Sequence, residues 1–160
     1  MKALVVYDSG FGNTEKIAHA IGSTLSPHSD VETVRVSALK SGQLTGLGII
    51  VVGSPTQKFR PTNAITNFLK GIPKNGLKGV KTAAFDTRFT MSEIEKTPVL
   101  LFFVRIFGYA AKPIADRLKR KGGKLIIPPE GFYVEGVEGP LQEGELERSA
   151  DWAKMIIDAQ

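Results

Sequence analysis

Cysteine is absent from this chain of 160 residues, and histidine occurs only twice. Without cysteine, the chain cannot form disulfide bonds, thiol nucleophiles or cysteine-ligated metal centres. His19 and His28 are isolated, with no second ligand at a spacing that suits a metal ion, so we predict no metal site. No Ser-His-Asp set and no paired carboxylates can be recognised either, so the sequence names no catalytic residue.

Long hydrophobic runs are also missing. The most apolar segment, Val99–Ala111, would span roughly 20 Å as a helix, which is short of the roughly 30 Å of a bilayer core. We therefore predict no transmembrane segment. The chain begins directly in a strand-like run without the features of a signal peptide, so we expect a cytoplasmic protein. At this length, residues 1–160 are expected to form a single domain.

The beginning of the chain is its most informative part. The run Ala3–Asp8 is apolar almost throughout, which predicts a strand buried on both faces of a parallel sheet. The tight, hydroxyl-rich turn Ser9–Thr14 follows it. Apolar residues then recur at helical spacing, at Ile17, Ala18, Ile21 and Leu25. Such a turn at a helix N-terminus exposes backbone N–H groups at the positive end of the helix dipole, so it predicts a phosphate-binding loop.

The order of residues in this loop narrows the kind of phosphate. Neither G-x-x-x-x-G-K-S/T nor G-x-G-x-x-G is present, so the P-loop and the dinucleotide fingerprint are both excluded. The segment Val5–Thr14 instead resembles the FMN-phosphate loop of the flavodoxin family. The matching positions are Ser9, Gly12, Asn13 and Thr14. Flavodoxins often carry threonine where this chain has Gly10 and Phe11, so the resemblance implies FMN contacts there through backbone amides.

The rest of the sequence alternates strand and helix signals, which predicts an α/β fold with a doubly wound parallel sheet. Further strands are predicted at Val31–Val36, Leu47–Gly53, Lys81–Asp86 and Lys124–Ile127. Helical faces are predicted at Ile65, Phe68, Leu69 and Ile72, at Ile114, Ala115 and Leu118, and, in a C-terminal helix from about Gly144, at Leu146, Ala150, Ala153 and Ile157. This rhythm resembles the five-stranded flavodoxin-like sheet, with strand order 2-1-3-4-5.

In that topology the turns after strands 1, 3 and 4 meet at one edge of the sheet. The segment Gly53–Asn63 resembles the Gly-Ser/Thr-Pro-Thr loop of flavodoxin-like quinone reductases and short flavodoxins, which implies that it lies along the flavin ring. The implied contacts in this loop are Ser54, Pro55, Thr56, Gln57, Lys58 and Phe59. After strand 4, Asp86, Thr87 and Arg88 stand where flavodoxins usually have a glycine-rich segment beside the pyrimidine end of the flavin. The alternative is a plain loop with a helix cap at Thr62 or Asn63 and Phe59 merely tucked inward, followed by a solvated Arg88.

The two ring loops carry an excess of positive charge. Lys58, Arg60 and Arg88 are opposed by Asp86 alone. Because fully reduced FMN is anionic, nearby cations lower its energy. We therefore predict a less negative potential for the second electron than acidic flavodoxins have. Solvent-facing side chains would be screened and would leave the potential unchanged.

Charge is uneven along the rest of the chain, whose formal net charge is +5. A basic cluster lies on and after one predicted helix, at Arg117, Lys119, Arg120, Lys121 and Lys124. A solvated helix face is the simplest interpretation, and steering of an acidic redox partner or an anionic membrane surface is the alternative. Nucleic acid is not expected, because the cluster lacks interleaved aromatics. The acidic residues Glu143, Glu145 and Glu147 are expected to form a solvated first turn, and Trp152 is expected in the core.

The segment Thr90–Ala111, between strand 4 and its helix, is longer than in simple flavodoxins, so we interpret it as a helical insertion beside the flavin edge. Thr97 and Pro98 suit a helix start, and Val99–Ala111 is apolar almost all round. A packed helix or homodimer contact is the leading interpretation of Val99–Ala111. A pocket for an apolar substrate such as a quinone and a peripheral membrane contact are the alternatives. The pocket would be walled by Phe102, Phe103, Phe107 and Tyr109.

The resemblance implies an FMN-binding electron-transfer protein that shuttles electrons between redox partner proteins. The alternative is a small FMN-dependent oxidoreductase that passes electrons from NAD(P)H, a nicotinamide substrate, to a quinone. A flavin-free interaction protein that keeps the fold is a third hypothesis. The sequence favours the carrier but leaves open whether the protein is an enzyme.

Overall fold

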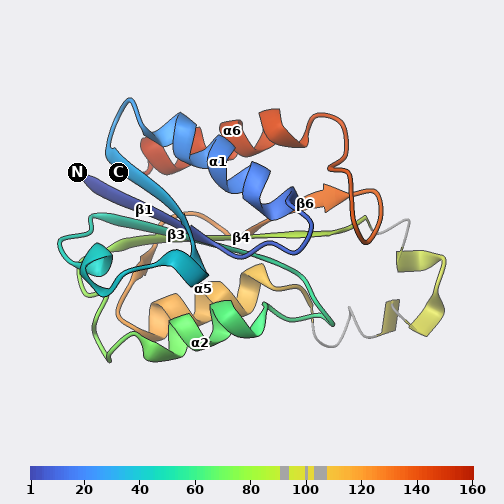
Figure 1. Ribbon diagram of the computed structural model, residues 1–160, viewed down its shortest axis with the longest axis horizontal. Helices are drawn as coiled ribbons and strands as arrows, with labels where there is room; N and C mark the ends of the chain where they lie inside the picture. Colours follow the sequence, from blue (N-terminus) through green and yellow to red (C-terminus); the bar gives the residue numbers. More distant parts are fainter. Residues whose placement is uncertain (91–93, 100, 103–107) are drawn as a thin grey trace.

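The computed structural model describes residues 1–90, 94–99, 101–102 and 108–160. In chain order its elements are β1 Lys2–Tyr7, α1 Asn13–Leu25, β2 Asp30–Arg35, β3 Ile49–Pro55, α2 Asn63–Gly71, β4 Lys81–Phe89, α5 Ala111–Arg120, β5 Lys124–Leu125, β6 Glu130–Val134 and α6 Glu145–Asp158. The strands form one parallel sheet in the order β2-β1-β3-β4-β5, with β6 also paired to β4. Helices α1 and α6 cover one face and α2 and α5 the other (Figure 1). The predicted fold class is confirmed.

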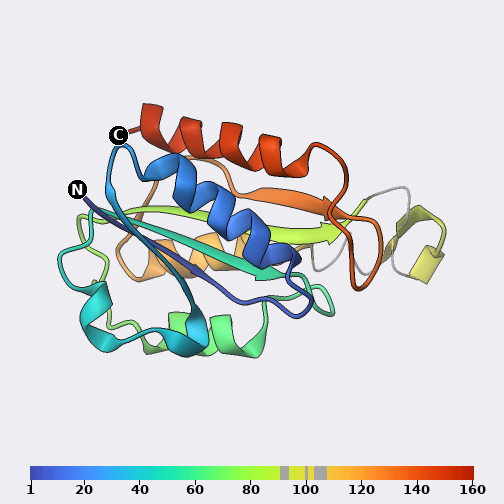
Figure 2. The same cartoon turned by 45° about the horizontal axis from the view of Figure 1, so that its top comes forward.

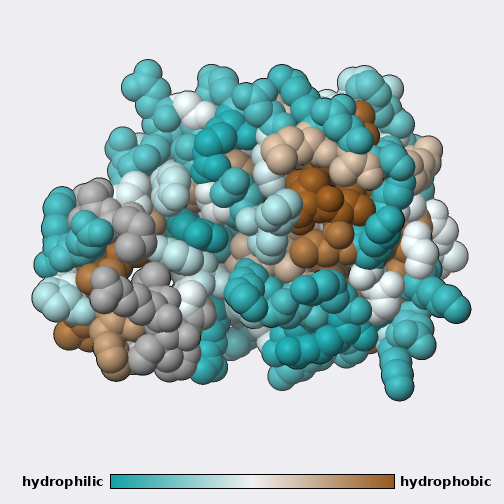
Figure 3. All heavy atoms as spheres, turned by 180° about the vertical axis from the view of Figure 1, so that it is seen from behind, coloured by the Kyte–Doolittle hydropathy of each residue, from teal (hydrophilic) through white to brown (hydrophobic). Residues whose placement is uncertain are grey.

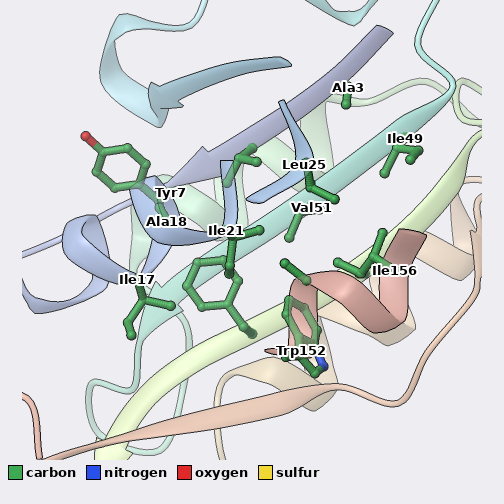
Figure 4. Packing of buried hydrophobic residues seen from close by; sticks show 14 of the residues in the cluster. Ala3, Tyr7, Ile17, Ala18, Ile21, Leu25, Ile49, Val51, Trp152 and Ile156 are labelled. Atoms are coloured by element: carbon green, nitrogen blue, oxygen red, sulfur yellow. The ribbon is translucent and has the colours of Figure 1, made fainter. Parts of the chain in front are cut away.

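Strands β1 and β3 form the middle of the sheet and are buried on both faces, as their apolar runs predict. Alternate residues of each strand enter different core clusters. Figure 4 shows the cluster beneath α1 and α6, where Ile17 and Ile21 pack beside Trp152. The other cluster joins Leu4 and Val52 to α2 and α5. This two-sided burial fixes the C-terminal ends of β1 and β3, from which two of the predicted site loops start.

The sequence predicts one strand, Lys124–Ile127, at the edge of the sheet next to β4. The structure instead has two short strands there: β5 pairs with the start of β4, and β6 pairs with its end, at Phe85–Phe89. Pro128 and Pro129 lie between them, and proline cannot donate a hydrogen bond to a strand ladder. Pairing with β6 also carries β4 three residues beyond its predicted end at Asp86.

The face of helix α6 that packs on the core differs in part from the predicted one: Ala153 is buried and Ile157 packs against the core as expected, but Ser149 and Ile156 are buried as well. Leu146, expected inside, is 43% exposed, whereas Trp152 is buried as expected. Glu145, expected in a solvated turn, is buried: its carboxylate accepts hydrogen bonds from the Tyr133 N–H at 2.7 Å and from Arg148 at 2.7 and 2.9 Å. Arg148 also donates to the Gly131 carbonyl. These contacts fasten α6 to β6 and account for the buried Glu145.

We expect Glu145→Gln to weaken the fold in a pH-dependent way. Burial alone would raise the pKa of Glu145, but hydrogen bonds from Arg148 and the Tyr133 N–H outweigh it and hold the pKa below its ordinary value. A carboxyl group with a lowered pKa stabilises the fold above its unfolded pKa, and this stabilisation is lost as pH falls through the folded pKa. The substitution should therefore lower the free energy of unfolding by about 1–2 kcal/mol at pH 7.

At pH values below about 4, near the unfolded pKa of glutamate, the difference between Glu145→Gln and the original chain should shrink. Urea unfolding at both pH values measures it. The exposed Glu147 offers the same substitution as a control. An equal loss at neutral and acidic pH would show that the carboxylate charge is not what stabilises this contact.

The insertion projects from the edge of the sheet where β4 ends (Figures 1 and 2). Helical residues occur at 94–95, 98–99 and 101–102, but Gly108 and Tyr109 are not helical and α5 begins only at Ala111. The prediction of one helix over Val99–Ala111 is therefore wrong at its C-terminal end, where Gly108 adopts a φ of 69°. Val99 and Phe102 are 62% and 60% exposed, and Figure 3 shows hydrophobic atoms on this projecting segment. Phe103 and Phe107 lie outside the described residues.

No helix in the described ranges is long and apolar enough to cross a membrane.

Candidate functional site

A cavity of about 410 Å³ lies at the edge of the sheet where the loops after β1, β3 and β4 converge. Its volume falls within the roughly 300–1,000 Å³ of small-molecule sites. Twelve of the fifteen predicted contact residues line it: Ser9, Gly10, Phe11, Asn13, Thr14, Pro55, Thr56, Gln57, Lys58, Phe59, Thr87 and Arg88. The other three, Gly12, Ser54 and Asp86, are not among the lining residues. Their contact with FMN, like that of the twelve, stays a prediction.

The loop after β1 is folded so that backbone N–H groups remain available. The Gly12 N–H donates to Ser9 Oγ at 3.0 Å, and the Ser9 N–H donates to Asp8 Oδ1 at 2.9 Å. Gly12 caps α1 with a φ of 91°, a conformation that favours glycine. The first backbone bond of α1 runs from the Lys16 N–H to the Gly12 carbonyl. The preceding N–H groups, those of residues 13–15, have no acceptor within the helix, which is the arrangement that suits an anion at a helix N-terminus.

Two side chains tie this loop to distant segments. Thr14 Oγ1 lies 2.9 Å from Thr87 Oγ1, and both residues are buried. Asn13 Nδ2 donates to the Glu138 carbonyl at 3.1 Å, which joins the loop to the segment after β6. Sequence reasoning missed that segment. It also missed four lining residues, Phe89, Ile94, Val134 and Val137, and named a fifth, Tyr109, only as part of a substrate pocket. The aromatic and β-branched run Phe132–Val134 was the available signal for β6, and nothing local placed its end beside the first loop.

The loop after β3 contains a tight two-residue turn. Gln57 and Arg60 exchange backbone hydrogen bonds of 2.8 and 2.9 Å, and Lys58 and Phe59 between them have φ values of 47° and 65°. Turns of this kind normally use Asn-Gly, so a Lys-Phe pair here carries backbone strain. Phe59 nevertheless lines the cavity, as predicted from the sequence.

The base of this loop is held by hydrogen bonds. Ser54 Oγ accepts from the Thr62 N–H at 3.0 Å and donates to the Pro55 carbonyl at 2.9 Å. Thr62 also caps α2 by accepting from the Ile65 N–H at 3.4 Å. The helix cap and the cavity-lining role, which the sequence offered as alternatives, are thus both present.

The end of β4 holds a buried ion pair. Asp86 is fully buried, and its oxygens accept hydrogen bonds from Arg88 Nε at 2.6 Å and Nη2 at 2.8 Å. The Ala111 N–H adds a third bond at 2.8 Å. Burial raises the pKa of Asp86, against the opposing effects of Arg88 and the Ala111 N–H. The Arg88 guanidinium also lies 3.8 Å from the centre of the Tyr109 ring.

These contacts change the expected charge balance of the site. Arg88 is not a solvated surface residue, because its guanidinium is paired with the Asp86 carboxylate. The guanidinium lies against Gly131, where a Cβ would stand 2.0 Å from Arg88 Nε. Lys58 and Arg60 are exposed, and no ion pair joins either of them to another described residue. The excess positive charge near the cavity therefore comes from these two side chains.

The insertion returns to the site at its C-terminal end. The Ala110 N–H donates to Thr56 Oγ1 at 3.1 Å. Tyr109 and Ile94 both line the cavity. The insertion therefore lies against the candidate site, and Tyr109 is the one residue of the expected aromatic wall that the structure places among the lining residues.

Comparison with known proteins gives consistent matches. The family model described as "Flavodoxin domain" matches residues 4–101. "Probable flavodoxin 1" from Bacillus subtilis (strain 168) is 33% identical over 87 residues, which cover 52% of this chain and 54% of that protein, so the match spans about half the length of this relative. Oxidised flavodoxin 1 from Bacillus cereus matches with a TM-score of 0.77 at 16% identity, over 99% of this chain and 98% of that one. A flavodoxin from the domain Archaea matches with a TM-score of 0.77 at 23% identity, over 99% of both chains.

Proposed function

The chain belongs to the flavodoxin family, and from this premise we propose that its cavity binds FMN non-covalently and that the protein shuttles electrons between redox partner proteins. Flavodoxins bind FMN. The observation that carries the proposal is the convergence of three loops on one cavity, with an anion-binding loop at the N-terminus of α1. A role as an NAD(P)H-dependent quinone oxidoreductase is not favoured, because the relatives are named as flavodoxins.

The residues present fit a flavin phosphate at the first loop. Ser9 Oγ uses an acceptor position for the Gly12 N–H, so its own hydrogen remains available to a phosphate oxygen. The hydrogen bond between the Thr14 and Thr87 hydroxyls uses the hydrogen of only one of them, so the hydrogen of the second hydroxyl remains available to a ligand. Gly10 and Phe11 can offer only backbone N–H groups. The loop thus supplies a cluster of donors and, among its own residues 9–14, no acidic side chain.

The rest of the cavity fits a flat aromatic ring. Phe59, Phe89 and Tyr109 contribute aromatic surface to the lining. Val134 and Val137 add aliphatic surface to the lining at and after the end of β6. Bound FMN would supply the redox chemistry, while these residues hold it, orient it and set the local charge.

Titration of the ligand-free protein with FMN tests the proposal. One molecule should bind per chain, with a changed visible spectrum and quenched flavin fluorescence. Absence of binding at micromolar FMN would overturn the proposal. Anaerobic mixing of the loaded protein with NADH or NADPH then separates the two redox roles: a carrier keeps its oxidised spectrum, whereas an oxidoreductase is bleached rapidly. A cytoplasmic location and a dimer contact through Val99–Ala111 stay predictions.

The Asp86–Arg88 pair should control the potential of bound FMN. Full reduction adds negative charge to the flavin, so an unbalanced charge on the cavity wall shifts the potential. Arg88→Gln leaves Asp86 unbalanced and should make the potential for the second electron more negative. Asp86→Asn leaves Arg88 unbalanced and should make it less negative. We expect each change to alter the ratio of affinities for reduced and oxidised FMN about tenfold, or roughly 1.4 kcal/mol.

Spectroelectrochemical titration measures both shifts. The exposed pair Lys112 and Asp116 on α5, 2.9 Å apart, offers the control substitutions Lys112→Gln and Asp116→Asn, which should leave the potential unchanged. Shifts in the same direction for Arg88→Gln and Asp86→Asn would mean that the pair matters for local structure rather than for charge.

A further inference from the structure

A second hollow lies between the C-terminal ends of α2 and α5. Its volume is about 360 Å³, and the described residues that line it are all cationic: Lys70, Lys74, Arg117, Arg120 and Lys121. We refer to these five residues as the basic hollow. Both helices start beside the flavin cavity and run toward the opposite edge of the sheet (Figure 1). The basic hollow is therefore a separate site, at the far end of the molecule from the cavity.

The turns after α2 and α5, which carry some of these cations, are held together by backbone contacts. Lys121 Nζ donates to the Lys70 carbonyl at 3.1 Å, and the Leu77 N–H donates to the Lys121 carbonyl at 3.0 Å. Gly122 has a φ of 94°, and a Cβ there would lie 3.2 Å from Asn75 Cα, so the turns after α2 and α5 meet backbone to backbone. The backbone segments that carry the five cations are thus fixed relative to each other, and the five side chains line one hollow rather than a single helix face.

The basic hollow has no matching negative charge in the residues around it. Segments 63–85 and 117–129 contain neither aspartate nor glutamate. The carboxylate of Asp116 is taken by Lys112 at 2.9 Å and Lys119 at 3.4 Å. Helix C-termini favour nearby cations, which accounts for Lys70, Arg117 and Arg120, but Lys74 and Lys121 lie beyond the helices. Like charges around one hollow repel each other, and an anion between them removes that cost.

The lining chemistry narrows the anion. Arginine forks and lysine ammonium groups together suit phosphate oxygens. The lining contains no aromatic residue, which argues against the base stacking used by single-stranded nucleic acid sites, and no apolar residue that would enter a membrane. The hollow is small enough for a compact ligand. We propose that the basic hollow binds a compact anion that carries several phosphate groups, either free in solution or on the headgroup of a phosphorylated lipid.

Calorimetric titration with inorganic tripolyphosphate at physiological salt tests this, with the protein saturated with FMN so that the flavin phosphate loop is filled. We expect saturable binding of one tripolyphosphate per chain, weakened at least tenfold by Arg117→Gln combined with Arg120→Gln. The control is Lys16→Gln combined with Lys154→Gln, which removes two exposed charges from α1 and α6 and should change the affinity less than twofold. Equal weakening by the two double variants would mean that only the overall charge of the protein matters, and it would overturn the proposal.

Vesicles distinguish the two sources of phosphate. Binding to phosphatidylcholine vesicles that contain a phosphorylated inositol lipid, but not to pure phosphatidylcholine, would support a lipid headgroup. Tripolyphosphate binding alone would support a soluble anion. Failure to bind either probe would overturn the proposal, and the flavin spectrum followed in the same samples reports separately on FMN binding.

Discussion

Replacing Gly10 by aspartate is expected to weaken FMN binding at least a hundredfold and to leave riboflavin binding unchanged. Gly10 is exposed, lines the cavity and has no positive φ, and a Cβ there meets only Gln57 Nε2 at 4.0 Å. The new carboxylate should therefore fit without disturbing the fold. Two charges 4 Å apart near a protein surface repel by about 4 kcal/mol, and a hundredfold loss needs only about 2.7 kcal/mol. Fluorescence titration with each flavin measures both affinities.

Gly10→Asn is the matched control, because asparagine has the size of aspartate without its charge. It should change FMN affinity by less than about threefold, a few tenths of a kcal/mol. Riboflavin lacks the phosphate, so it reports on the ring site alone. Equal weakening of FMN and riboflavin by Gly10→Asp would place the phosphate elsewhere and would remove the main support for the proposed function.

The parts of the site that could be predicted from sequence are those determined by nearby residues. The first loop is one: a doubly buried strand, a glycine in the left-handed region and the start of α1 all lie within Ala3–Leu25. The middle of the sheet is another, because burial on both faces leaves a continuous apolar run. Local motifs, together with the family resemblance that they carry, therefore identified most of the lining residues and the strand order.

The parts that could not be predicted depend on contacts between distant segments. Asp86 accepts from Ala111, 25 residues later, and Arg88 lies over the Tyr109 ring; these contacts bring the end of the insertion back to β4. Glu145 lies in an acidic first helical turn of the kind that is usually exposed, yet it is buried and accepts hydrogen bonds from Arg148 and the Tyr133 N–H. Pro128 and Pro129 indicate that the predicted last strand is interrupted. The second strand, β6, which places Val134 at the cavity, could not be predicted because it depends on pairing with β4.

Replacing Phe85 by alanine is expected to cause the largest loss of stability in this chain. Phe85 is fully buried on β4 and packs edge-to-face with Phe132 of β6 and Trp152 of α6, with ring centres 6.1 and 6.2 Å away. Truncation removes one of three rings that all pack against one another, and it leaves a cavity. Substitutions of this kind cost about 3–5 kcal/mol, a large part of the roughly 5–15 kcal/mol by which domains are stable. Urea unfolding of the ligand-free protein measures the loss.

Phe11→Ala is the control, because it makes the same chemical change at a side chain that is 59% exposed. It should change the free energy of unfolding by less than about 0.5 kcal/mol. The Phe85 ring lies directly on Gly53 of β3: a Cβ at residue 53 would stand 2.0 Å from Phe85 Cζ. Because the ring fills this space above β3, we expect little collapse of the cluster when it is removed. A loss for Phe85→Ala as small as that for Phe11→Ala would mean that Phe132 and Trp152 move into the gap.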